Sequence, residues 1–176
     1  KNPSFNKSFN KKDYESNLLF TKKLVNYIIN KKIKFIFPSS SQIFKFKNKK
    51  VNENSKIQIT NYYTKFRVDA SKYLLKVKKK YKLNINIVIL FNHDSKYRNQ
   101  RFLLPRLIKA IKTKKYQFLK KIYLENINGD FTNAFDICYG LYLLVKKNKN
   151  PDKIILCSGK KTFINDIIDF FIPNFK

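Results

Sequence analysis

Polar side chains that could move protons follow two apolar runs of the sequence. Ser39-Ser40-Ser41-Gln42 comes directly after the first run, and Asn92-His93-Asp94-Ser95 comes directly after the second. In parallel α/β sheets, binding and catalytic groups gather just past the carboxyl ends of the strands. We therefore expect both segments to contribute to a functional site.

Tyr63 and Arg67 lie between these segments in the sequence. Their four-residue spacing places both side chains on one face of a helix. A cation near a tyrosine hydroxyl favours the phenolate, which is the form that accepts a proton. With a serine hydroxyl such as that of Ser40, the pair suits the oxidation of a sugar alcohol. Ordinary packing of Tyr63 is one alternative, and a one-residue shift that puts Tyr62 in its place is another.

The elements that must position these residues alternate between strand and helix patterns. Strands are predicted over residues 33–37, 85–91 and 153–157, and Pro38 is expected to end the first. Residues 92–99 are expected to form a polar loop, and residues 117–125 short strand-like stretches. Apolar residues at helical spacing predict helices over residues 13–30, 62–81, 102–111, 133–147 and 163–171. This alternation predicts an α/β protein.

The formal net charge of +28 favours a nucleic-acid partner or an anionic surface. However, nucleic-acid sites rely on arginine, and most of the basic residues here are lysines. Residues with A/T-rich codons are abundant, so drift of the gene toward A and T explains the charge better than nucleic-acid binding does. Polyanion binding stays an alternative, since aromatic and lysine residues alternate over residues 45–50.

Several classes of protein are excluded by composition. No apolar run approaches the roughly 20 residues that cross a bilayer, and residues 1–10 show no secretory signal. Cys138 and Cys157 lack metal-ligand spacing and the chain has one histidine, so no metal site is predicted. We expect both thiols to be reduced and packed in a cytoplasmic protein. Because methionine is absent, we expect that Lys1 is not the natural start and that upstream residues are missing.

The motifs resemble the extended short-chain dehydrogenase/reductase family, also called the NAD-dependent epimerase/dehydratase family. The resemblance rests on the serine-rich stretch Phe35 to Phe44, on Tyr63, and on the stretch Ile89 to Ser95. Within the family, Leu-Phe-Asn-His-Asp-Ser followed by Arg98 and Phe102 is most similar to the GDP-mannose 4,6-dehydratases. Residues 126–144 and 154–169 resemble later family segments in order and spacing, so the resemblance covers nearly the whole chain.

The resemblance implies the C-terminal part of a Rossmann-like parallel sheet with a small α/β substrate-binding lobe. It assigns residues 1–100 to a truncated nucleotide-binding domain and residues 101–176 mainly to the lobe, with the chain returning to the main sheet. The family's glycine-rich phosphate-binding turn has no counterpart among Gly129, Gly140 and Gly159. We therefore expect a marginally stable chain with an open edge on its first strand, which aggregates or needs a partner chain.

The resemblance also implies roles for single residues. Tyr63 takes the proton of the hydroxyl at C4 of the hexose, and Ser40 hydrogen-bonds the same oxygen. Gln42 stands where the family has the glutamate that removes the C5 proton, and Arg67 stands where it has the lysine that holds the cofactor ribose. The positions that contact NADP are Tyr63, Arg67, His93 and Arg98. The positions that contact the substrate are Asn92 and Ser41. Structural roles stay open for His93 and for the serines, which could cap the strand end.

The implied reaction is the dehydration of GDP-mannose through an internal redox cycle with NADP. Hydride leaves C4, water is lost across C5 and C6, and hydride returns to C6. Gln42 and Arg67 depart from the family, whose Arg-Asp-Trp stretch is here Gly129-Asp130-Phe131. Asp130 and Asp136 are open to a second interpretation as helix-start residues. We predict that the chain is a fragment of such an enzyme and is inactive alone. The alternatives are a catalytically dead remnant of the same fold and a module that binds polyanions. The sequence is also compatible with a homo-oligomer.

Overall fold

The computed structural model describes residues 9–31, 33–45 and 50–175, which form two compact units. The sheet unit comprises residues 9–91 and 139–156, and the small unit comprises residues 92–138 and 157–175. The boundary falls inside helix α5, which spans Ala134–Lys146. Lys1 and most of the predicted lysine-aromatic segment lie outside the described residues.

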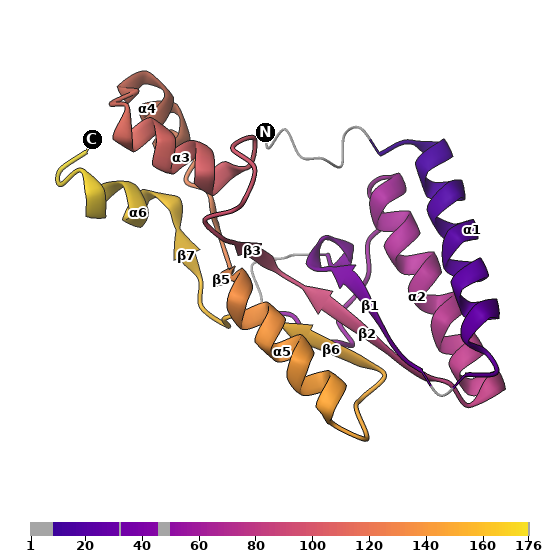
Figure 1. Cartoon of the computed structure of the whole chain (residues 1–176). Coiled ribbons are helices and arrows are strands. Elements are labelled where there is room, and N and C mark those ends of the chain that lie inside the picture. Colours follow the sequence, from indigo (N-terminus) through magenta and orange to yellow (C-terminus); the bar gives the residue numbers. More distant parts are fainter. Residues whose placement is uncertain (1–8, 32, 46–49, 176) are drawn as a thin grey trace. The chain divides into compact units, whose positions relative to one another are not determined.

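A parallel sheet forms the centre of the sheet unit (Figure 1). Its strands are β1 (Lys34–Ser40), β2 (Asn84–Leu90) and β6 (Lys153–Leu156), in the order β1-β2-β6. The middle strand β2 is buried from Ile85 to Ile89, so both of its faces are covered. This burial agrees with its continuous apolar sequence, which is typical of central strands in parallel sheets.

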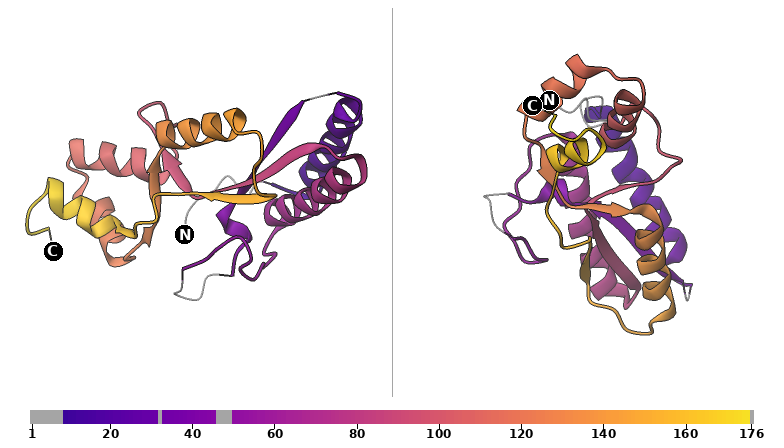
Figure 2. Two further views of the ribbon diagram at one scale, coloured as in Figure 1. Left: turned by 90° about the horizontal axis from the view of Figure 1, so that it is seen from below. Right: turned by 90° about the vertical axis from the view of Figure 1, so that its left-hand side faces the viewer.

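Helices α1 (Lys11–Ile28) and α2 (Tyr62–Tyr81) pack against each other and cover one face of this sheet (Figures 1 and 2). Odd-numbered residues of β2 meet them in a core that includes Val25, Phe66 and Leu74. A short 3-10 helix, η2 (Ser41–Ile43), follows β1 directly and also packs against α2. The serine-rich end of β1 is therefore placed beside α2.

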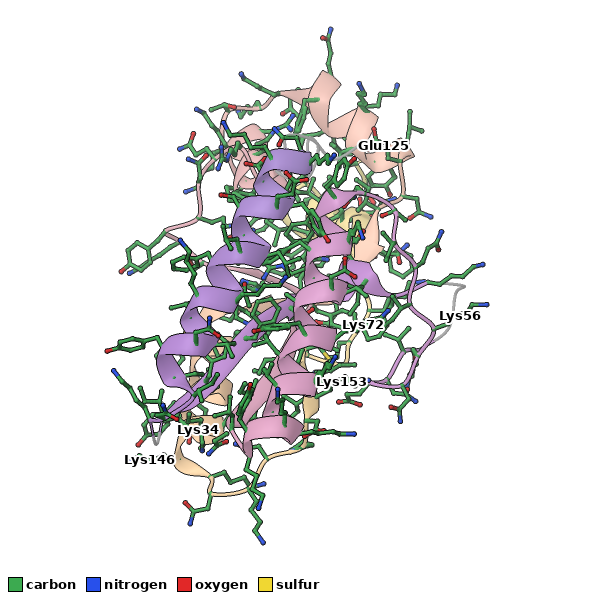
Figure 3. The ribbon with its side chains drawn as sticks, turned by 90° about the vertical axis from the view of Figure 1, so that its right-hand side faces the viewer. Lys34, Lys56, Lys72, Glu125, Lys146 and Lys153 are labelled. Atoms are coloured by element: carbon green, nitrogen blue, oxygen red, sulfur yellow. The ribbon has the colours of Figure 1, made fainter. Side chains whose placement is uncertain are left out.

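The C-terminal part of α5 covers the opposite face of the sheet. A Cβ on Gly140 would lie 3.1 Å from the side chain of Leu156, which is on the face away from the α1–α2 core. The Lys34 ammonium donates to the carbonyl oxygens of Leu144 and Val145, at 3.0 and 2.8 Å. A lysine at this position satisfies carbonyl groups that the end of a helix leaves unpaired. Figure 3 shows Lys34 and Lys146 at the same end of the sheet unit.

The small unit has a separate core built from helices α3 (Leu103–Lys112), α4 (Tyr116–Leu124) and α6 (Ile164–Phe171). Short strands precede or follow these helices. β3 (Asn92–Asp94) pairs in parallel with β5 (Phe131–Asn133), and β4 (Asn128–Gly129) pairs antiparallel with β7 (Thr162–Phe163). The side chains that are fully buried in this core are Leu107, Leu119, Ile164 and Ile168.

The expectation that Pro38 ends the first strand was wrong, because β1 continues to Ser40. The Ile87 N–H donates to the carbonyl oxygen of Asp152, just before β6, and the Phe91 N–H donates to that of Leu156 in β6. The backbone N–H and C=O groups of the even-numbered residues of β2 therefore point toward β1. Ile36 lies opposite Asn86, so the backbone N–H and C=O groups of the even-numbered residues of β1 point away from β2. Pro38 is one of them, and its missing N–H therefore breaks no hydrogen bond of the ladder.

Residues 117–124 are helical, not strand-like as predicted for residues 117–125. Apolar residues alternate through Tyr116, Phe118, Ile122 and Leu124, which imitates the period of a strand. Packing against α3 and α6 selects the helix, with Leu119 and Ile122 buried. Local periodicity was overridden by tertiary contacts.

Two smaller expectations also need correction. Residues 92–94 of the predicted loop form β3 and pair with β5. Both cysteines are exposed rather than packed. Cys138 follows buried Ile137 on α5 and so lies off the buried face, and Cys157 lies one residue past β6.

Candidate functional site

The end of β1 carries the first group of candidate residues. Ser39 and Ser40 are its last two residues, and Ser41 and Gln42 begin η2. All three serines are buried, whereas Gln42 is exposed. Ser40 Oγ accepts a hydrogen bond from the Gln42 N–H at 3.3 Å, so this serine does cap the turn.

The start of α2, which packs against η2, carries Tyr63. Asn61 caps the helix: its Oδ1 accepts from the Thr64 N–H at 2.9 Å, and Thr64 Oγ1 accepts from the Asn61 N–H at 3.1 Å. This reciprocal cap fixes where the helix begins and therefore which residues share a face. Tyr63 falls in the first turn, and Arg67 lies one turn later on the same face.

The guanidinium of Arg67 contacts the ring of Tyr63, 4.9 Å from its centroid. It also lies 5.3 Å from the ring of Phe66 and 5.7 Å from that of Phe37. Nη1 of Arg67 donates to the Pro38 carbonyl oxygen at the outer edge of β1. The planar guanidinium is thus held by ring faces and one carbonyl, an arrangement that a lysine ammonium could not reproduce.

Phe9 is a further contact of Tyr63 that the sequence did not indicate. Its ring meets the Tyr63 ring edge-on, with centroids 5.7 Å apart and planes at 83°. The same ring stacks on Phe66 at 6.0 Å. Phe9 directly precedes Asn10, which caps α1 through hydrogen bonds exchanged with Asp13. The Asn-x-x-Asp spacing of this cap is the sequence feature that could have indicated a helix start directly after Phe9.

A charged network joins α1 to α2 near this site. The Tyr14 hydroxyl and the Lys65 ammonium both donate to Asp69 Oδ2, at 2.9 and 2.8 Å. Burial alone would raise the pKa of the Asp69 carboxyl, but the hydrogen bonds from Lys65 and Tyr14 outweigh burial and hold that pKa below its usual 3.8. Burial and the bond to Asp69 raise the pKa of Tyr14.

This network predicts an acid-sensitive contribution to stability. The folded state lowers the pKa of Asp69, so its stabilisation is present above the usual value of 3.8 and is lost as the pH falls through the lower folded value. We expect Asp69→Asn to lower Tm by about 2–4 °C at pH 7, because the network is partly exposed to solvent. The difference from the unchanged protein should shrink below pH 3.8 in thermal unfolding followed by circular dichroism. A difference that is constant from pH 7 to pH 3 would contradict this assignment.

The small unit carries the second group of candidates. Asn92 and His93 lie in β3, where His93 pairs with Thr132 of β5. Arg98 Nη1 donates to the His93 carbonyl oxygen at 3.3 Å, and the Arg98 guanidinium stacks 3.9 Å from the centroid of the Phe102 ring. The structure thus brings His93 and Arg98 together within this unit.

Asn92 is exposed, and Gly129 leaves room for its side chain. A Cβ on Gly129 would lie 3.2 Å from Asn92 Nδ2, closer than most side-chain contacts. A side chain at position 129 would therefore require the exposed Asn92 side chain to shift by a few tenths of an ångström.

Asp130 is not a helix-start residue, contrary to that interpretation. Its carboxylate accepts from the N–H groups of Ser158 and Gly159, at 3.0 and 2.7 Å, and from the Thr132 hydroxyl at 3.0 Å. Gly159 has φ +72°, a left-handed conformation that favours glycine. Asp130 thus fixes the turn after β6, whereas Asp136 does lie in the first turn of α5.

The groups present suit one end of a nicotinamide dinucleotide. Hydroxyl, phenol and guanidinium groups can bond a ribose and a carboxamide. Among the described residues of the sheet unit, the buried Ser39 Oγ and Arg67 Nε have no hydrogen-bond partner. A pyrophosphate needs the backbone amides of a glycine-rich turn, and no such turn occurs in this sequence.

Other kinds of site receive no support in the part of the chain that the structure describes. No group of three or more His, Cys, Asp or Glu side chains there could hold a metal ion. None of the described helices is both long and apolar enough to span a bilayer.

The model of the GDP-mannose 4,6 dehydratase family matches residues 4–173 of the sequence. The chain belongs to this family. A search of curated proteins finds no match. Family membership confirms the resemblance that the serine-rich stretch and the Asn-His-Asp-Ser stretch predicted.

Solved structures that contain a nicotinamide cofactor share the fold of this family member. The dTDP-glucose 4,6-dehydratase of Bacillus anthracis, in complex with NAD, has a TM-score of 0.76 at 15 % identity. RMD from Pseudomonas aeruginosa, complexed with NADPH, has a TM-score of 0.76 at 16 % identity. The UDP-glucuronic acid 4-epimerase of Bacillus cereus, in complex with UDP-glucuronic acid and NAD, has a TM-score of 0.76 at 20 % identity.

These matches cover 92, 96 and 96 % of this chain but only 52, 62 and 55 % of the solved chains. The chain therefore spans little more than half the length of the proteins it is similar to. The likeness confirms the predicted α/β, Rossmann-like fold. The division at residue 100 and the roles of single site residues stay predictions.

Proposed function

We propose that this chain supplies the proton-transfer groups of a nucleotide-sugar 4,6-dehydratase whose whole protein acts on GDP-mannose with NADP. The observation that carries the proposal is the group at the end of β1, in a chain of this family. There Arg67 contacts Tyr63, is anchored on the Pro38 carbonyl, and lies beside the serine-rich stretch.

Tyr63 is the base in the first step, and it accepts the proton of the C4 hydroxyl of the hexose. Arg67 stabilises the phenolate by its positive charge, and Ser40 donates a hydrogen bond to the same sugar oxygen. NADP, when bound, supplies the acceptor and later the donor of hydride. The C4 oxygen ends the reaction as a carbonyl oxygen, so Tyr63 does not return its proton there; the proton that completes the last step goes to C5, when hydride returns to C6. Burial of the serines limits competing water at this oxygen.

Gln42 limits the elimination step. An amide has no carboxylate oxygen that could accept the C5 proton, so loss of water across C5 and C6 lacks its base. We therefore propose that the chain with Gln42 is slow or inactive in dehydration even when it can oxidise C4. An inactive remnant of the same fold is the competing proposal, and polyanion binding is the third.

The remaining roles follow the same pattern. Arg67, Tyr63, His93 and Arg98 are proposed to contact NADP, and Asn92 and Ser41 the substrate. The buried Ser39 hydroxyl, which has no partner among the described residues, is compatible with a ligand at this strand end. The solved structures from Bacillus anthracis and Pseudomonas aeruginosa contain NAD and NADPH respectively, which supports a nicotinamide cofactor as a class.

The test uses the protein isolated from its natural source, with NADP and, in separate reactions, GDP-mannose, dTDP-glucose and UDP-glucuronic acid. We expect the keto sugar to form, slowly, with GDP-mannose and not with the other two. Turnover of another sugar in place of GDP-mannose would overturn the substrate assignment. No turnover and no NADP binding would favour the remnant, and binding of DNA or RNA that weakens steeply with salt would favour the polyanion reading.

A further inference from the structure

Phe9 is not among the proposed site residues, yet it touches the tyrosine on which the proposed function depends. It directly precedes the cap of α1, and its ring meets the Tyr63 ring edge-on, with centroids 5.7 Å apart. The neighbours of the two rings show whether Phe9 is held firmly enough to orient Tyr63.

The Tyr63 ring contacts two groups, and both of them rest on Phe66. Phe9 stacks on the Phe66 ring, with centroids 6.0 Å apart and planes at 25°. The Arg67 guanidinium lies 5.3 Å from the centroid of the Phe66 ring and 4.9 Å from that of Tyr63. Phe66 is 6 % exposed and belongs to the core of the sheet unit, so it gives Phe9 and Arg67 a common, close-packed support.

Phe9 is also fixed from the side of α1. The next residue, Asn10, caps this helix: its Oδ1 accepts from the Asp13 N–H at 3.1 Å, and Asp13 Oδ2 accepts from the Asn10 N–H at 2.9 Å. One turn later, the Tyr14 hydroxyl donates to Asp69 of α2 at 2.9 Å. The two helices lie side by side (Figure 1). The backbone that carries Phe9 is therefore tied to the helix that carries Tyr63.

Tyr63 needs outside contacts because its own helix does not fix its ring. It lies in the first turn of α2 and is half-buried. A side chain with free space exchanges between rotamers in picoseconds to nanoseconds, and each exchange carries a tyrosine hydroxyl to a different place. A base must stay within hydrogen-bond distance of the proton it accepts. Contacts that exclude the other rotamers of Tyr63 therefore favour proton transfer.

We propose that Phe9 is a positioning residue that, together with Arg67, holds the Tyr63 ring in one rotamer. The catalytic consequence rests on the proposed function, whereas the restriction of the ring does not. Phe9 acts through Tyr63 and not through the substrate. Loss of the Phe9 ring therefore lowers the rate of proton transfer in the bound complex and leaves the affinity for the nucleotide sugar unchanged.

Phe9→Leu is the first variant, because it removes the ring and keeps an apolar side chain. We expect the single-turnover rate of C4 oxidation in the complete enzyme to fall by about 10–10²-fold, while the half-saturating sugar concentration stays within about twofold. Phe9→Tyr keeps the ring and should stay within about threefold of the unchanged rate. The matched control is Phe20→Leu, the same change on α1 at a side chain that is 60 % exposed, and it should alter neither quantity.

Fluorine NMR measures the Tyr63 ring without any need for activity. Fluorotyrosine replaces Tyr63 in the complete protein, and its chemical shift is compared with the value in urea. With Phe9 or Phe9→Tyr the two values should differ clearly, because one rotamer keeps the fluorine in fixed surroundings. With Phe9→Leu the difference should shrink by at least about half, since the ring then averages over rotamers. Circular dichroism shows whether each variant folds.

The two readouts separate failure of the positioning role from failure of the proposed function. An unchanged fluorine shift in Phe9→Leu would refute the restriction of the ring, and a rate that Phe9→Tyr loses as Phe9→Leu does would exclude a role of the ring. A released ring with an unchanged rate, in an enzyme that Tyr63→Phe inactivates, would overturn the positioning role. If the ring responds as expected but the complete protein oxidises no sugar, the restriction stands and the proposed function fails instead.

Discussion

Replacing Tyr63 with phenylalanine should lower the rate of C4 oxidation by about 10²–10⁴-fold in the complete enzyme, because the variant loses the group that accepts the hydroxyl proton. The ring itself remains, so its contacts with Phe9 and Arg67 are kept. Stability should therefore change little. The measurement is a single-turnover assay of nicotinamide reduction at saturating nucleotide sugar, which reports hydride transfer before dehydration.

Tyr62→Phe is the matched control, because it makes the same chemical change one residue away. Tyr62 is 42 % exposed and its ring contacts Tyr14 on α1, not Arg67. We expect its rate to stay within about threefold of the unchanged enzyme, a difference worth less than about 1 kcal/mol. A large loss with Tyr62→Phe and none with Tyr63→Phe would move the catalytic position by one residue and refute the assignment.

Elements with a strong local pattern were predictable from the sequence. The helix over residues 62–81 agrees with α2 at both ends, because its apolar residues Val68, Leu74 and Val77 recur at helical spacing and all are buried. The run of β-branched residues in β2 likewise indicated a central strand. The prediction was wrong for short elements in which the local pattern and the packing disagree. In α4, the alternation of apolar and polar residues around Phe118 is typical of a strand, but the segment is a helix.

Contacts between distant segments could not be predicted in the same way. The spacing of Tyr63 and Arg67 predicted their shared face, since both belong to one helix. Nothing local indicated that Arg67 would reach the Pro38 carbonyl, that Phe9 would meet Tyr63, or that Glu53 would cover the edge of β6. Each of these contacts depends on how separate elements pack, which single-sequence patterns do not encode.

The edge of β1 shows how both kinds of information combine. Sequence reasoning treated Pro38 as a strand terminator, because proline usually interrupts a ladder. The register shows instead that Pro38 faces outward, where its missing N–H protects the edge beside Tyr63. The same residue therefore allows β1 to continue and limits how far a neighbouring strand can pair.

Gln42→Glu should raise the rate of dehydration by about 10²–10⁴-fold in the complete enzyme, because it restores a carboxylate that accepts the C5 proton. The change is isosteric, Gln42 is exposed, and its backbone N–H rather than its side chain donates to Ser40. The fold should therefore tolerate the variant without loss of Tm.

Two readouts separate this gain from a general improvement. Exchange of the C5 hydrogen with solvent deuterium, followed by mass spectrometry of the sugar, should accelerate in Gln42→Glu, while single-turnover oxidation at C4 should not. Gln42→Asn, which keeps the amide and shortens the side chain, should show neither effect. If Gln42→Glu leaves deuterium exchange unchanged although C4 oxidation proceeds, then residue 42 does not stand at C5, and the chain's departure from its family lies elsewhere than in a lost base.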